Sequence, residues 1–197
     1  MRQPETTKEN VLLEATKLFN TKGYKTTSIS DITTATGYTK GAIYRHFENK
    51  EALEMEAFEK MMSTVFTVMA YRIKSEATAK DKLFSLLDMF QNYITNPYMK
   101  GGCPLLNVAI EMDDTNDPLK QRAQKALAVL RNSIITIIEN GKKFNQVKSS
   151  VNEDLFATIT IATLEGGIMM SKLQNNNKDI SDIVLHLKNW IAKDILK

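Results

Sequence analysis

Five side chains in one short stretch can donate hydrogen bonds to an anion or to the edge of a nucleic-acid base. They are Lys40, Tyr44, Arg45, His46 and Lys50. Lysine and arginine match the acceptors that guanine presents in the major groove, and all five side chains can donate to phosphate oxygens. The group could bind a nucleic acid, provided that the local fold presents it on one face.

The residues around this group predict two short helices joined by a tight turn. Ser28 opens a Ser-x-x-Asp capping box, Gly37 tolerates a left-handed backbone, and Thr39 can cap the second helix. Ile43 and Phe47 are four residues apart, so they share the buried side and leave the donors outside. The pattern predicts a helix-turn-helix whose outer face suits the DNA major groove. A helical hairpin with a solvated polar face is the alternative.

The expected DNA-binding set combines base readers with phosphate contacts. Lys40 and Arg45 are expected to read bases, while Gly41 and Ala42 are small enough to let the helix sit deep in the groove. The other polar side chains are expected to hold phosphates and set the register. The full set is Ser28, Thr39, Lys40, Gly41, Ala42, Tyr44, Arg45, His46 and Lys50.

The run Thr39-Lys-Gly-Ala-Ile-Tyr-Arg-His-Phe47, followed by Asn49-Lys-Glu-Ala-Leu53, closely resembles the signature of TetR/AcrR-family transcriptional regulators. The end of the first expected helix, Phe19 to Gly23-Tyr24, is similar to that family too. The motif covers about the first quarter of the chain, and Tyr38 departs from it where the family usually has a smaller aliphatic residue. The resemblance implies an all-α fold of about nine helices. An N-terminal three-helix helix-turn-helix domain would precede a larger helical domain for effector binding and dimerisation.

Composition and charge agree with such an organisation. Four prolines, eight glycines and no strand-like alternation favour an all-helical chain. Residues 1–50 hold eight Lys and Arg against five Asp and Glu, whereas residues 51–197 hold eighteen of each, so the net charge of +3 lies in the first segment. We therefore expect a DNA-binding domain at 1–50, with the start of the next helix, and an effector and dimerisation domain at 51–197. Asn49 can cap a long helix to about Lys74, which would act as a lever between them.

Methionine and phenylalanine gather in the larger segment, which contains nine of the ten methionines. These side chains can simply fill a helical core, or they can line a cavity that accepts varied apolar ligands. The family resemblance implies an effector pocket here. The expected walls are Met62, Phe66, Met69, Phe90, Cys103, Asn107, Ile110, Glu165 and Met169, with Asn107 and Glu165 as polar anchors.

Cys103 has two possible roles. It lies in a Gly-Gly-Cys-Pro turn at an expected helix start, where a lowered thiol pKa could make it a sensor of oxidants or electrophiles. Alternatively, it is a small buried residue in a tight turn. A single cysteine excludes an intrachain disulfide and fits a reducing compartment. With no apparent signal peptide or membrane span, we expect a cytoplasmic protein.

The last two expected helices, about 153–174 and 179–196, are apolar on more than one face. A monomer would expose part of that surface, so we expect a dimer interface there. The family resemblance implies a four-helix bundle made by two subunits. The expected interface residues are Phe156, Gly167, Met170, Ile183, Leu187, Trp190 and Ile191.

The sequence offers little for an enzyme. His46 and His186 are far apart, and no phosphate-binding loop, nucleophile elbow or zinc-binding helix motif is present. The acidic residues from Glu111 to Asp117 lack a compact metal-ligand pattern, so we expect no metal and no cofactor.

The expected partners are double-stranded operator DNA, a second copy of the chain and a partly apolar small-molecule effector. The expected function is a ligand-released repressor on a pseudo-palindromic operator. The alternatives are an activator of the same fold, or a redox regulator acting through Cys103.

Overall fold

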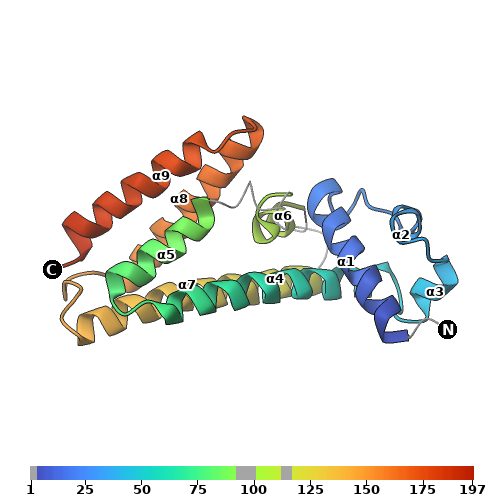
Figure 1. Cartoon of the computed structure of the whole chain (residues 1–197), viewed down its shortest axis with the longest axis horizontal. Coiled ribbons are helices and arrows are strands. Elements are labelled where there is room, and N and C mark those ends of the chain that lie inside the picture. The colour runs from blue at the N-terminus through green and yellow to red at the C-terminus, as the bar shows by residue number, and fades with distance from the viewer. Residues whose placement is uncertain (1–3, 92–100, 112–116) are drawn as a thin grey trace. The chain divides into compact units, whose positions relative to one another are not determined.

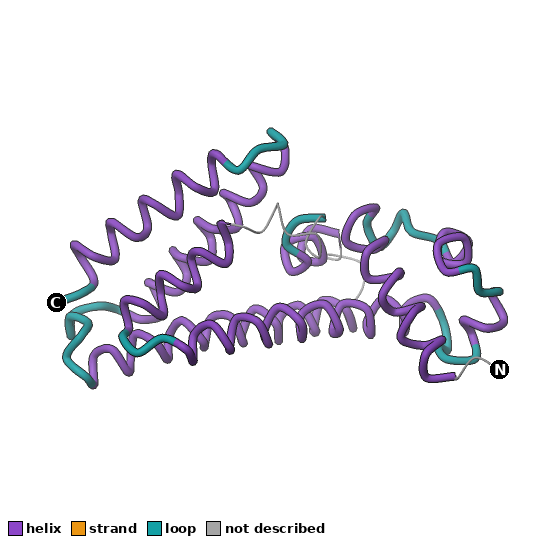
Figure 2. The backbone as a smooth tube through the Cα atoms, viewed as in Figure 1, coloured by secondary structure: helices purple, strands orange, loops and turns teal. Residues whose placement is uncertain are grey.

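The structure is a computed structural model of the 197-residue chain and describes residues 4–91, 101–111 and 117–197. These ranges form nine α-helices and a terminal π-helical turn, with no strand among them (Figure 2). The prediction of an all-α chain of about nine helices is confirmed. The helices are α1 (Pro4–Lys22), α2 (Ile29–Thr36), α3 (Lys40–Tyr44), α4 (Lys50–Ser75), α5 (Ala79–Gln91), α6 (Pro104–Glu111), α7 (Asp117–Lys143), α8 (Glu153–Leu173) and α9 (Lys178–Trp190), followed by the π-helical turn Ile191–Ile195.

The chain divides into two compact units, and the division falls inside helices α4 and α7. Unit 1 comprises Met1–Thr64 and Tyr98–Lys125, and unit 2 comprises Val65–Pro97 and Ala126–Lys197. The domain boundary expected at residue 50 coincides with the first residue of α4, whereas the division between the compact units falls after Thr64. Helix α6 and the first turns of α7 belong to unit 1 with the N-terminal helices, although they come from the middle of the chain.

Local signals set the helix ends in unit 1. The Asp31 backbone N–H donates to the Ser28 hydroxyl, and the Asp31 carboxylate accepts from the Ser28 backbone N–H, so the capping box is complete. Gly37 ends α2 at φ 71°, a left-handed conformation that glycine adopts without the steric cost of a Cβ. The Asn49 side chain accepts from the Ala52 N–H at 2.8 Å and starts α4, which confirms the predicted long helix.

The core of unit 1 is a compact cluster of apolar side chains from α1 to α4. Phe19 and Tyr24 stack with their ring centroids 4.9 Å apart, and both are buried. Fully burying a side chain of this size contributes about 1.5–3 kcal/mol, so the cluster holds the short helices in place. Its other members include Val11, Ala15, Ile32, Ile43, Phe47, Leu53 and Phe58.

Unit 2 is built from helices α5, α8 and α9 together with the C-terminal parts of α4 and α7. Figure 1 shows α8 and α9 side by side, joined by a short turn. A Cβ at Gly167 would lie within 3 Å of side-chain atoms of Ile180 and Ile183, so this glycine allows the two helices to pack closely. The Lys188 ammonium also reaches the Asp88 carboxylate of α5 at 2.5 Å.

None of the helices in the described ranges combines the length and the apolar character that crossing a membrane requires.

Candidate DNA interface and effector region

Helix α3 is fixed from beneath by two buried side chains. Ile43 is fully buried and Phe47 is 2% exposed. The helix proper ends at Tyr44, but the N–H groups of Arg45 and Phe47 still donate to carbonyls one turn earlier. The Thr39 hydroxyl starts the helix by accepting the Ala42 N–H at 3.2 Å. The anchored side leaves the opposite side of the turn free to meet a partner.

The outer side of α3 carries most of the expected DNA contacts. Lys40, Gly41, Tyr44 and Arg45 are exposed. Ala42 and His46 are half-buried, and the His46 ring packs edge-on against Phe47. Three hydrogen-bond donors and the small Gly41 therefore share one accessible surface, which has the chemistry required for contacts to base edges and phosphates.

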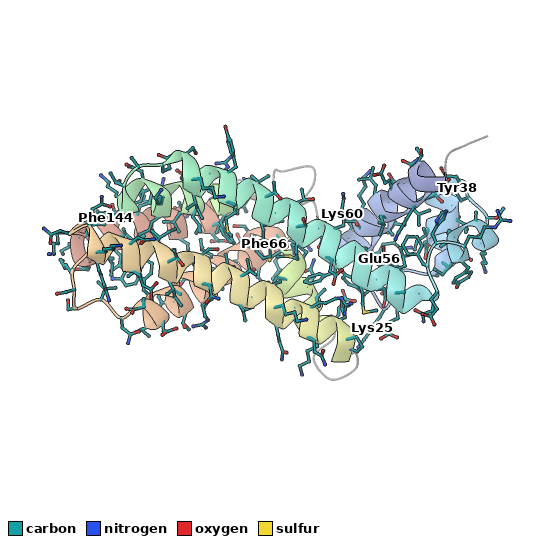
Figure 3. The ribbon with its side chains drawn as sticks, turned by 90° about the horizontal axis from the view of Figure 1, so that it is seen from below. Lys25, Tyr38, Glu56, Lys60, Phe66 and Phe144 are labelled. Carbon is teal, nitrogen blue, oxygen red and sulfur yellow. The ribbon has the colours of Figure 1, made fainter. Side chains whose placement is uncertain are left out.

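Tyr38, the departure from the family signature, has a structural role at the entry to α3. Its side chain is half-buried, and its hydroxyl accepts from the Asn10 amide at 3.4 Å (Figure 3). The larger residue thus connects the turn to α1.

Ser28 and Lys50, like Thr39, have other hydrogen-bond partners in this structure. The Ser28 hydroxyl donates to the Asp31 carboxylate at 2.6 Å while it caps α2. The Lys50 ammonium donates to the Tyr24 carbonyl at 2.7 Å and pairs with the Glu54 carboxylate at 3.1 Å. The cap formed by Ser28 is the one that the sequence predicts, whereas the bonds of Lys50 to Tyr24 and Glu54 have no counterpart in the sequence prediction. A phosphate would have to compete with these bonds.

Three ionisable groups of unit 1 have pKa values shifted by burial, hydrogen bonds or nearby charges. The Lys22 ammonium and the Ser28 hydroxyl and N–H lower the pKa of Asp31, because each stabilises the carboxylate. Burial raises the pKa of Glu54, and the nearby Lys50 offsets only part of that effect. Burial, followed by the charges of Glu111 and Glu54, raises the pKa of the Tyr24 phenol.

Helix α6 is bonded directly to the turn between α1 and α2. The backbone N–H groups of Tyr24 and Lys25 donate to one Glu111 carboxylate oxygen at 2.7 and 3.2 Å. The Asn107 amide donates to the Asn20 side-chain oxygen at 2.9 Å and to the Asn20 carbonyl at 3.3 Å. We call these bonds the α6 latch. They connect residues more than eighty positions apart, all within unit 1.

The latch also requires glycine at positions 23 and 101, and these two residues are the only sign of it in the sequence. A Cβ at Gly101 would lie 1.9 Å from the Asn20 carbonyl oxygen, so no other residue fits without moving the backbone. Gly23 adopts φ 94° in the turn, beneath the Glu111 carboxylate. The sequence places Gly101 and Gly102 in a Gly-Gly-Cys-Pro turn at an expected helix start, but it does not identify Asn20 as the residue that packs against Gly101.

The nine expected effector residues do not line one cavity in the described parts of the chain. Met62, Cys103, Asn107 and Ile110 belong to unit 1, whereas Phe66, Met69, Phe90, Glu165 and Met169 belong to unit 2. The Asn107 amide donates to the Asn20 side-chain oxygen and to the Gly101 carbonyl, so a ligand at this position would compete with these bonds. Ile110 is 67% exposed and Met169 is 47% exposed, so these two face solvent in this structure. Cys103 is buried.

Unit 2 contains a cavity of about 670 Å³ between α4 and α7, with walls also from α5 and from the segment after α7. Met69 is the one expected effector residue that lines it. The cavity lies towards the end of α7, where Figure 3 labels Phe144.

The expected dimer residues mostly face the interior of unit 2. Phe156, Leu187 and Ile191 are buried, and the Phe156 ring stacks on Trp190 at 5.2 Å. Helix α9 packs directly against Gly167. Met170, in contrast, is 38% exposed. The sequence identified the two apolar helices but not which face packs within the subunit.

No group of three potential metal ligands comes together in the part of the chain that the structure describes. The Glu111 carboxylate is bonded to the backbone of unit 1, and Asp113 and Asp114 lie outside the described residues.

Comparison with known proteins places both regions of the chain. Residues 11–56 match the model for bacterial regulatory proteins of the TetR family, and residues 79–187 match the model for a tetracyclin repressor-like C-terminal domain. The chain belongs to the TetR family of transcriptional regulators. The family resemblance seen in the sequence is confirmed, and the family and the relatives of this chain are DNA-binding transcriptional regulators rather than enzymes.

Solved structures of similar proteins share the whole fold. A TetR regulator from Chloroflexus aurantiacus J-10-FL is 36% identical with a TM-score of 0.95, over 100% of this chain and 99% of that chain. A TetR-family regulator from Cytophaga hutchinsonii is 30% identical with a TM-score of 0.88, over 100% and 98%. Among curated relatives, the HTH-type transcriptional repressor DhaR of Mycobacterium sp. (strain GP1) is 22% identical over 90% of this chain and 88% of its own.

Proposed function

We propose that this TetR-family regulator is a repressor that binds a pseudo-palindromic operator as a homodimer. A small molecule that binds the C-terminal domain releases it from DNA. The observation that carries the proposal is the anchored helix α3, which exposes Lys40, Tyr44 and Arg45 above buried Ile43 and Phe47.

One α3 helix can contact only a few base pairs, so selective binding requires two. A two-fold dimer places two such helices about one helical turn of DNA apart, roughly 34–36 Å, or at another spacing set by its geometry. The operator should then contain an inverted repeat.

The surface that we assign to dimerisation is an exposed stripe on α8. Leu155, Ile159, Met169 and Leu173 recur at helical spacing on one face, and all are substantially exposed. A Cβ at Gly166, on the same face, would meet nothing within 4 Å, so the surface is open at its centre. We place the interface on this α8 stripe because Phe156, Leu187 and Ile191 of the sequence prediction are buried within unit 2, and the exposed Met170 borders the stripe. An exposed apolar stripe of this length favours a second apolar surface over water.

The α6 latch offers a route from the effector to DNA. The turn that receives Glu111 leads directly into α2, and Lys50 at the start of α4 bonds the same turn through the Tyr24 carbonyl. An effector that binds better when α6 is displaced would alter the support of α2 and α3, and would thereby favour a state that does not fit the operator. The latch and α4 would act together as the lever.

Cys103 has no part in the proposed release. Its burial separates the thiol from solvent electrophiles. The remaining alternative is an activator of the same fold. Whether expression from the operator falls or rises when the protein binds distinguishes the repressor from the activator.

Replacing Arg45 with alanine tests the proposal. The operator is first selected from random DNA with the wild-type protein, and affinities are then measured by electrophoretic shift. If Arg45 contacts a base, Arg45→Ala should weaken binding by about 5- to 150-fold, the cost of one lost base contact. Lys60→Ala removes one positive charge from an exposed position on α4 and serves as the matched control.

The control should remain within about twofold of wild type, which is the scale of a distant screened charge. Sedimentation should show the same dimer for all three proteins. Equal affinities for wild type and Arg45→Ala would remove α3 as the reading element. A reporter gene placed behind the operator then separates repression from activation.

A further inference from the structure

The cavity between α4 and α7 lies wholly within unit 2 and contains chemistry that DNA binding does not use. Its volume, about 670 Å³, lies within the range of small-molecule sites, about 300–1,000 Å³. It is open to solvent along one side, and each of its walls has a distinct character.

The floor of the cavity is apolar. Met69 and Ile137 are each less than 5% exposed, and Ile73 lies beside them on α4. Phe144 continues this surface directly after α7, where the residue is 66% exposed. An apolar body placed here would remove much of this surface from water.

One wall is a row of neutral polar groups. Asn132, Thr136 and Asn140 follow each other at four-residue spacing on α7, so they form a single ridge along the cavity. Within the described part of the chain, the side chains of these three residues make no hydrogen bonds. Their amide and hydroxyl groups are available to a ligand.

The charged residues that line the cavity are both lysines. Lys74 and Lys82 are its charged lining residues, and none of the sixteen lining residues is acidic. The Lys82 ammonium is engaged by the carbonyls of Ile73 and Glu76 at the end of α4. The Lys74 side chain is exposed and forms no ion pair with any described residue.

We propose that this cavity, the α4–α7 site, binds a small organic anion with an apolar body. The body would lie on Met69, Ile73 and Ile137, the anionic group would face Lys74, and the Asn–Thr–Asn ridge would bond any carbonyl or hydroxyl groups. The site names a ligand class for the small molecule that the proposed function places in the C-terminal domain, and it rests on that part of the proposal, although its test requires neither DNA binding nor dimerisation.

The test uses two probes with the same body and opposite charge, 2-naphthoate and 2-naphthylmethylammonium. Isothermal titration calorimetry on the full chain at low salt should show the anion binding more tightly than the cation. Lys74→Glu should weaken 2-naphthoate binding by at least about fivefold, because it replaces an attraction with a repulsion. Arg72→Glu makes a comparable charge reversal two residues away in the same last turn of α4, outside the cavity. It should change the affinity by less than about twofold.

A second pair of variants tests the location without changing charge. Ala70 is an exposed lining residue, so Ala70→Trp fills the cavity without disturbing a core. Ala128→Trp adds the same indole at an exposed position of α7 that does not line the cavity. Only Ala70→Trp should abolish 2-naphthoate binding.

Three results would overturn the proposal. They are the absence of 2-naphthoate binding to wild type at millimolar concentration, equal binding of both probes, and equal effects of a variant and its control. A change of oligomeric state in Ala70→Trp but not in Ala128→Trp would instead make the cavity a contact between copies of the chain. Operator affinity is measured separately, so loss of DNA binding by an α3 variant leaves the site standing.

Discussion

Removing the Glu111 carboxylate should loosen the turn between α1 and α2. In Glu111→Ala, the N–H groups of Tyr24 and Lys25 lose the oxygen that accepts them at 2.7 and 3.2 Å. The first bond is partly buried, so its loss should cost about 2 kcal/mol, a usual value for a hydrogen bond to a charged group. The second bond is exposed, where water replaces the carboxylate, and its loss should cost about 0.5 kcal/mol or less.

Amide hydrogen exchange measures this effect at the site. If local opening exposes the Tyr24 amide, a cost of about 2 kcal/mol lowers its protection about 30-fold. Glu111→Gln keeps an acceptor without the charge, so its effect should be about half as large in free energy. Glu59→Ala is the control, because it removes an exposed carboxylate that pairs with Arg122 at 2.6 Å elsewhere in unit 1.

The control should leave the Tyr24 amide unchanged. If protection of this amide is the same in Glu111→Ala and wild type, the latch does not restrain the turn, and the proposed route from α6 to α3 fails.

Three further variants test separate parts of the structure. Gly101→Ala should lower the free energy of unfolding by several kcal/mol, at least ~3, since its Cβ would overlap the Asn20 carbonyl; urea unfolding no different from wild type would contradict this. Glu54 has a raised pKa, so its contribution to stability is complete below the unfolded value of about 4.5 and is lost as the pH rises through the folded value. The difference in free energy of unfolding between Glu54→Gln and wild type should therefore favour the variant more at neutral pH than at pH 4.5. If that difference does not change with pH, Glu54 does not have this role. Ile159→Glu places a charge on the α8 stripe and should yield a monomer by sedimentation, whereas an unchanged dimer would move the interface elsewhere.

The sequence predicted those parts of the fold that depend on neighbouring residues. The Ser28 capping box, the Gly37 helix end and the Asn49 cap all have partners within a few positions, and all form as expected. The period of Ile43 and Phe47 likewise identified the buried side of α3. Its outer side follows by elimination.

The latch could not be predicted, because its partners are distant in sequence. Asn107 pairs with Asn20, and Glu111 with the Tyr24 backbone, across 87 positions in each case. A polar residue in a sequence does not indicate whether a distant residue will hydrogen-bond to it in the fold.

The faces of α8 could not be separated for a different reason. Buried Phe156 and Leu164 and exposed Leu155 and Ile159 are equally apolar, so periodicity marks no single core side. Only the packing of α9 over Gly167 shows which face is used within the subunit.

The most direct test of the central claim is selection of DNA from a random library by the wild-type protein and by the double variant Lys40→Ala, Arg45→Ala. If two α3 helices read an operator, the wild-type protein enriches an inverted repeat. The double variant enriches no such repeat, although it keeps the same dimer in sedimentation. Enrichment of the same repeat by both proteins, or of sequences without two-fold symmetry by wild type, would contradict the account.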